Sequence, residues 1–176
     1  MQESSDRSAR HHALNDLVAR SFASAGVPVT KEPAGLFRSD GKRPDGVSLV
    51  PWQSGKSLCW DLPTGRVIRR QSISPGMFSS RVGSHSQRDK YVDLGARYIF
   101  EPIAIETLGV FNASARQLLA DLGKRISINT GEATETSYLF QRISVLVQRF
   151  NAVLLHDSCR PLTARTDDRT HFCISY

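Results

Sequence analysis

Two short apolar runs in the first third of the chain constrain its fold more than any other feature. They are GVSLVPW at 46–52 and KSLCWDL at 56–62, and only the residues QSG separate them. Short runs rich in β-branched and aromatic residues are typical of strands, and a short glycine-containing connection is typical of a β-hairpin. Pro51 lies near the end of the first run, where a strand tolerates the loss of one N–H donor. The sequence therefore predicts a β-hairpin.

The segments on either side of this hairpin predict a mixed α/β (α+β) fold, because helical and strand-like periodicities alternate along the chain. In chain order we expect helix 8–25, strand 27–33, the two hairpin strands, helix 86–98, strand 99–108, helix 112–129 and helix 133–156. Pro102 indicates that strand 99–108 is an edge strand or begins there. The last two helices are expected to bury Ala115, Leu118, Leu119, Leu122 and Ile126 from the first, and Tyr138, Leu139, Ile143, Leu146, Val147, Phe150 and Val153 from the second.

The length of 176 residues and an apolar content of 40% suit one domain with its own core. We expect a disordered N-terminus at 1–7, a domain with a C-terminal helical pair at 8–156, and a disordered tail at 157–176. No apolar run approaches the ~18 residues of a membrane span, and no signal peptide is recognisable, so we expect an intracellular protein without membrane contact. Three cysteines without a CxxC pair argue against a disulfide framework and a cysteine zinc site.

The two aspartates that flank the hairpin are the strongest candidates for chemistry. Asp45 enters the first strand and Asp61 ends the second, and in an antiparallel hairpin these positions lie side by side at the end opposite the turn. Mg²⁺ usually takes one or two carboxylates and completes its shell with water and substrate phosphate. The alternative is that Asp45 caps a turn and Asp61 is a solvated strand end. Trp60 alternates with Asp61 and is expected to pack in the core.

Basic residues surround this pair and raise the chain's net charge to +6, with a pI near 9.6. A basic surface favours the phosphate backbone of DNA, although a solvated basic loop has the same composition. We expect no small-molecule cofactor. The candidate DNA contacts near the aspartates are Lys42, Arg43, Arg66, Arg69 and Arg70.

The sequence RPDG, followed by a strand, a turn and WD, resembles the PD-(D/E)xK nuclease signature. The segments HHALNDLVARSFASAGVPVTKEP, KYVDLGARYIFEPIAIETLG and LFQRISVLVQRFNA are similar to the endonuclease segment that follows the reverse transcriptase in some non-LTR retrotransposons. The resemblance covers about residues 10–155. It implies a restriction-endonuclease-like core of helix, three-stranded antiparallel meander, helix and strand, with two C-terminal helices. It also implies that Asp45 and Asp61 bind Mg²⁺ or Mn²⁺ for DNA hydrolysis, in a protein that is nuclear if it is functional.

The chain departs from this signature at the lysine position, where it carries Pro63. The resemblance then implies Lys90, on the following predicted helix, as the residue that stabilises charge in the reaction. Glu32 is a candidate third carboxylate, and the alternative is a surface glutamate before a proline. His11 and His12 are expected to face solvent near a helix start. A catalytically inactive remnant of a retrotransposon, which binds nucleic acid weakly or serves as an interaction module, is the alternative to an active nuclease.

Overall fold

The computed structural model describes residues 2–36, 41, 43–62, 97–105 and 109–158. Within these residues the chain has a mixed α/β fold, as the sequence predicts. Its elements are α1 (Gln2–Ser24), β1 (Val29–Lys31), β2 (Gly46–Gln53), β3 (Lys56–Asp61), β4 (Tyr98–Pro102), α3 (Ala113–Thr130) and α4 (Glu135–Ser158). None of the helices in this part of the chain has the length and apolar character needed to cross a membrane.

The four strands form one mixed sheet in the order β1-β2-β3-β4. The first three strands form an antiparallel meander, whereas β4 runs parallel to β3. Within the described residues β4 is an edge strand, which is one of the two possibilities that Pro102 indicated, and Pro102 is its final residue. The predicted helix at 86–98 lies outside the described residues except for Arg97 and Tyr98, and Tyr98 begins β4.

A two-residue turn closes the hairpin and gives it a defined register. Ser54 and Gly55 both have positive φ angles, +51° and +73°, which is the combination required by the tight hairpin turns that match strand twist. Gln53 and Lys56 therefore pair directly across the turn, and Gly46 pairs with Trp60 near the other end. The register shifts on either side of Pro51, so the strand accommodates the proline through an irregularity.

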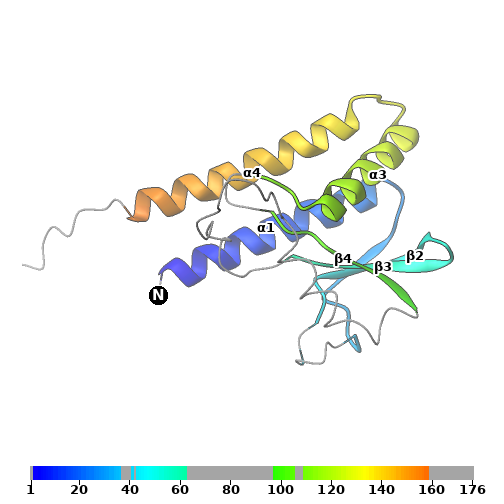
Figure 1. Cartoon of the computed structure of the whole chain (residues 1–176), viewed down its shortest axis with the longest axis horizontal. Coiled ribbons are helices and arrows are strands. Elements are labelled where there is room, and N and C mark those ends of the chain that lie inside the picture. Colours follow the sequence, from blue (N-terminus) through cyan, green and yellow to red (C-terminus); the bar gives the residue numbers. More distant parts are fainter. Residues whose placement is uncertain (1, 37–40, 42, 63–96, 106–108, 159–176) are drawn as a thin grey trace, which may run out of the picture.

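The core lies between the sheet and the three helices, which lie on one side of the sheet in Figure 1. Its centre is Trp60, which is fully buried and stacks on Phe22 of α1 with ring centroids 4.9 Å apart. Trp52 meets the same phenylalanine edge to face at 5.4 Å. All five residues of the predicted α3 stripe are buried. The core position predicted for Trp60 is thus confirmed.

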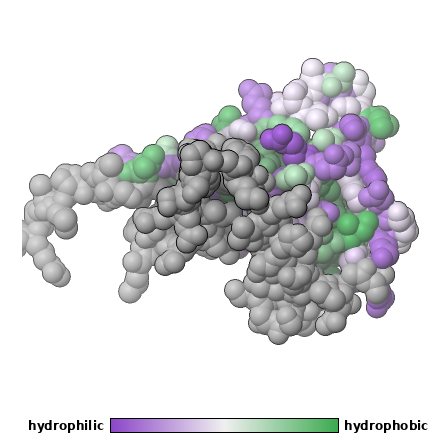
Figure 2. Space-filling model, viewed as in Figure 1, coloured by the Kyte–Doolittle hydropathy of each residue, from purple (hydrophilic) through white to green (hydrophobic). Residues whose placement is uncertain are grey.

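Several details differ from the sequence prediction. The predicted strands 27–33 and 99–108 are shorter in the structure, at Val29–Lys31 and Tyr98–Pro102. The first helix begins at Gln2, so residues 2–7 are helical instead of disordered; the apolar periodicity starts only at Leu14 and could not locate polar first turns. Tyr138 and Val153 of α4 are 52% and 43% exposed, because the buried face centres on Leu139, Ile143 and Val147. Figure 2 shows hydrophobic residues at the surface among hydrophilic ones. The last helix also extends to Ser158, two residues into the predicted tail, and 159–176 lie outside the described residues.

Candidate functional site

Asp45 and Asp61 lie next to each other at the end of the hairpin opposite the turn. The backbone N–H of Asp45 donates to the carbonyl of Trp60 at 3.0 Å, and its carboxylate Oδ2 accepts from the backbone N–H of Leu62 at 2.5 Å. Asp45 therefore contacts the residues immediately before and after Asp61. Both aspartates are buried, with 8% and 7% of their surface exposed. The proximity expected from hairpin geometry is present.

Contacts from three parts of the fold hold Asp45 in place. The second carboxylate oxygen, Oδ1, lies 3.0 Å from Nε2 of His11 on α1. The backbone carbonyl of Asp45 accepts hydrogen bonds from Asn15 Nδ2 at 3.0 Å and from the backbone N–H of Glu32 at 3.1 Å. A buried carboxylate is costly unless it is hydrogen-bonded, and hydrogen bonds to a charged group are the stronger ones. These contacts therefore stabilise Asp45 as a buried acidic group.

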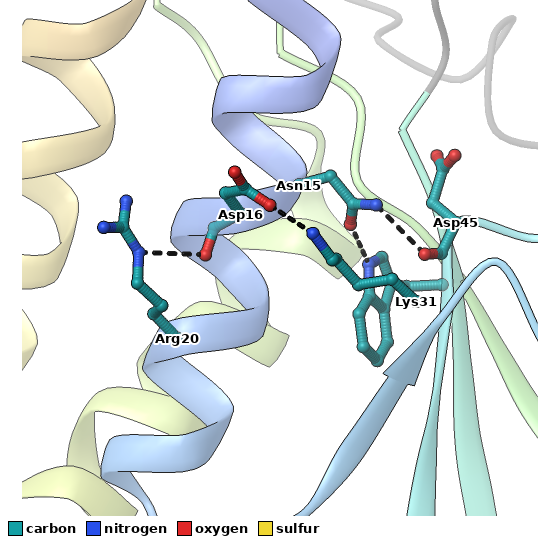
Figure 3. A network of polar contacts seen from close by, with 6 residues as sticks. Asn15, Asp16, Arg20, Lys31 and Asp45 are labelled. Atoms are coloured by element: carbon teal, nitrogen blue, oxygen red, sulfur yellow. Dashed lines mark hydrogen bonds and ion pairs between the residues drawn. The ribbon is translucent and has the colours of Figure 1, made fainter.

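Asn15 connects the first helix to the hairpin at this point. Its Nδ2 donates to the carbonyl of Asp45, while its Oδ1 accepts from the indole Nε1 of Trp60 at 3.0 Å. Figure 3 shows Asn15 reaching from α1 toward Asp45. The side chain is only 3% exposed, so both bonds form away from bulk water. A single amide thus fixes the position of Asp45 relative to the core tryptophan.

The negative charges of Asp45 and Asp61 act on two neighbouring side chains. The hydrogen bond to Asp45 raises the pKa of His11, and the charges of Asp45, Asp61 and Glu32 add to this effect while burial opposes it. Burial, together with the charges of Asp61 and Asp45, raises the pKa of the Cys59 thiol to about 12. The imidazole of His11 and the thiol of Cys59 therefore both experience the negative charge of Asp45 and Asp61.

This donor set fits a divalent cation of the Mg²⁺ type. Mg²⁺ takes oxygen ligands and uses one or two carboxylates together with water and phosphate, so Asp45 and Asp61 would suffice as protein ligands. Each carboxylate oxygen has two lone pairs, so the bonds from His11 and Leu62 leave acceptor capacity on Asp45. The described residues contain no group of three or more His, Cys, Asp or Glu side chains arranged for a metal. Glu32, which is exposed, acts on the site through its charge.

Two residues of the site differ from the sequence prediction. His11 was expected to face solvent, and Asn15 was not predicted as part of the site. His11 lies on α1 in line with Asn15, Val18 and Phe22, at spacings of four, three and four residues. Asn15, Val18 and Phe22 are buried. A polar residue such as Asn15 within the apolar stripe of a helix is the sequence signal of a polar side chain that faces the core.

The remaining candidate residues fall into two groups. Arg43 is described and exposed, two positions before Asp45. The others lie outside the described residues: Lys42, Arg66, Arg69, Arg70 and Lys90.

Comparison of the chain with protein-family models and with curated proteins found no match. Its function is therefore inferred from the residues and geometry of this site.

Proposed function

We propose that the chain is a metal-dependent DNA endonuclease-like domain of retrotransposon origin, with a restriction-endonuclease-like core. The observation that carries the proposal is the pairing of two buried carboxylates, Asp45 and Asp61, at the open end of the hairpin. Their charges act together on His11 and Cys59, so a divalent cation between them would neutralise a concentrated negative potential. The order of the meander and the parallel strand β4 supports the same core.

The chain's own residues would divide the work at this site. Asp45 and Asp61 would hold Mg²⁺ or Mn²⁺, which when bound polarises a phosphodiester and activates water for its hydrolysis. His11 and the Leu62 N–H orient the Asp45 carboxylate. Lys90 would stabilise the charge that develops on the phosphate. The DNA backbone would meet the basic residues that flank the pair in the sequence, which are Lys42, Arg43, Arg66, Arg69 and Arg70.

A second candidate is a catalytically inactive domain that binds nucleic acid weakly. The observation that favours it is that both oxygens of Asp45 already accept hydrogen bonds within the protein. Such a carboxylate is satisfied without a cation. Pro63 at the lysine position of the signature favours the same alternative.

Plasmid nicking distinguishes the two candidates. The purified full chain is incubated with supercoiled plasmid in Mg²⁺, in Mn²⁺ and in EDTA, beside the variants Asp61→Asn and Asp121→Asn. Asp121 is a matched control, because it is an acidic residue on α3 whose carboxylate bonds to Gln117. An active nuclease nicks with metal and loses this activity in Asp61→Asn alone. Absence of nicking selects the inactive candidate, and equal nicking by Asp61→Asn contradicts the assignment of the site.

Metal binding is measured separately, without DNA. Thermal unfolding is followed as Mn²⁺ is added, because a ligand at a hundredfold excess over its dissociation constant stabilises the native state by about 2.7 kcal/mol. Wild type and Asp121→Asn should show the same rise in Tm, and Asp61→Asn should show none. A rise in Tm without nicking would identify a metal-binding domain that does not cut DNA.

A further inference from the structure

The outer face of α4 presents three large apolar side chains to solvent. Val145 and Leu155 are 61% and 66% exposed, and Tyr138 is 52% exposed. The opposite side of the same helix buries Leu139 and Ile143 in the core. Isolated exposed hydrophobic residues are common, but three of them aligned on one helix face indicate an interaction surface.

These residues follow the spacing of a helix-packing seam. Alternating steps of three and four residues align six exposed positions on the side away from the core, which are Tyr138, Gln141, Val145, Gln148, Ala152 and Leu155. A repeat of this kind keeps one stripe of a helix facing a second helix. The seam extends over about 25 Å at a rise of roughly 1.5 Å per residue. The outer face of α4 is therefore long enough for a partner helix of four to five turns.

Positive charge follows this seam along one flank. Arg142 and Arg149 are exposed and lie seven residues apart, and His156 continues the same row. The guanidinium of Arg142 lies 5.5 Å from the ring centroid of Tyr138, so the cationic row borders the seam directly. Residues 136–156 contain no aspartate or glutamate. Glu135, at the start of α4, is the acidic residue seven positions before Arg142 on this flank, so the row is basic over the rest of its length.

We propose that the outer face of α4 docks an amphipathic helix of another protein, with apolar residues in the seam and acidic residues opposite Arg142 and Arg149. Charge complementarity identifies this occupant. In a twofold antiparallel pair of two copies, equivalent flanks meet, so the two arginines of each copy would face a row whose acidic member is Glu135 at one end. In a parallel pair the arginines would face the flank of Ser137 and Ser144 and gain no ion pair. A nucleic acid backbone would satisfy the arginines but would leave Val145 and Leu155 in water.

A designed peptide tests this surface on the full chain. The probe is a fluorescent helical peptide of about three heptads, with leucine in the seam and glutamate on both flanks; the same peptide with lysine in place of glutamate is its control. Binding is measured by fluorescence anisotropy for wild type, Arg149→Glu, Val145→Asp and Arg116→Glu. Arg116 is an exposed arginine on α3, so its reversal changes the net charge equally. Circular dichroism verifies that every variant keeps the wild-type helix content.

The acidic peptide should bind wild type saturably, and the lysine peptide should not. Because like charges and a buried carboxylate both oppose docking, Arg149→Glu and Val145→Asp should each weaken binding at least about tenfold. Arg116→Glu should stay within about twofold of wild type, since a rim or remote charge contributes little. Absence of saturable binding, or equal loss in all three variants, would overturn the proposal. So would a DNA duplex that binds to the same face, or a dimer of the chain that Val145→Asp dissociates.

Discussion

A methyl group added at Gly46 tests the packing that positions the candidate site. A Cβ at this position would lie 2.0 Å from Cζ2 of Trp60 and 2.4 Å from Cη2, well inside van der Waals contact. The indole cannot move away easily, because it is fully buried, stacks on Phe22 at 4.9 Å and donates to Asn15. Gly46→Ala is therefore expected to destabilise the protein, although alanine is normally the better strand residue.

The magnitude follows from two opposing contributions. Replacing a strand glycine by alanine ordinarily stabilises the folded state by roughly 0.5–1 kcal/mol, because an unfolded chain with alanine has less conformational freedom to lose on folding. Forcing an extra carbon into a close-packed core costs typically about 1–3 kcal/mol and occasionally more. The 2.0 Å approach to a rigid ring places Gly46→Ala at the upper end of that range. We expect a net loss of about 2 kcal/mol, or about 4–8 °C in Tm for a chain of this size.

Urea unfolding followed by far-ultraviolet circular dichroism measures this loss as a lower midpoint. The double variant Gly46→Ala/Trp60→Phe provides the internal check, since a phenyl ring lacks the indole atoms that approach the new methyl. In the Trp60→Phe background, the added cost of Gly46→Ala should fall by at least half. Gly55→Ala serves as the control, because its cost arises from a φ of +73° with no atom within 4 Å. A Gly46→Ala protein as stable as wild type would refute the tight contact.

Two further predictions concern α1. The pKa of His11 is raised above 6.5, so the folded state binds the imidazole proton more strongly than the unfolded state does. The protonated His11 therefore stabilises the folded state, and this contribution is complete below about pH 6.5. That stabilisation disappears as pH rises through the raised pKa, so the deficit of His11→Gln in urea unfolding should shrink as pH rises above about 6.5; a constant deficit would exclude this linkage. Asn15→Ala leaves the Trp60 N–H buried without its acceptor and should cost about 2 kcal/mol in the same assay. An unchanged midpoint would contradict the bridging role of Asn15.

The features that the sequence predicts correctly are those with local causes. The hairpin follows from two β-rich runs and a connection containing Gly55, whose positive φ completes the turn. The α3 stripe follows from helical spacing alone, and each of its positions is buried. The edge position of β4 follows from Pro102, which has no N–H for a further strand. Each of these needs only neighbouring residues.

Long-range contacts account for what the sequence could not predict. Asn112 occupies the N-cap position of α3, but its side chain makes no capping bond. Its Oδ1 accepts from the backbone of Ala104, and its Nδ2 donates to the carbonyl of Pro102. A capping asparagine and one that fixes the preceding segment have the same local sequence. Likewise, His11 meets Asp45 only because the fold brings residues 34 positions apart into contact.

The charge of the site is opposite to the charge of the chain, and this contrast bears on how the site could meet DNA. The whole chain carries +6 and attracts polyanions, whereas Asp45 and Asp61 concentrate negative charge where the candidate reaction would occur. A phosphate that reached two ionised carboxylates directly would be repelled, because like charges at short range and low dielectric interact strongly. If the proposed function holds, DNA should therefore bind the basic residues that flank the pair in the sequence with or without a divalent cation. Close approach of a phosphate to the aspartate pair should require a divalent cation. Asp45 and Asp61 should therefore weaken DNA binding without metal and strengthen it when metal is added.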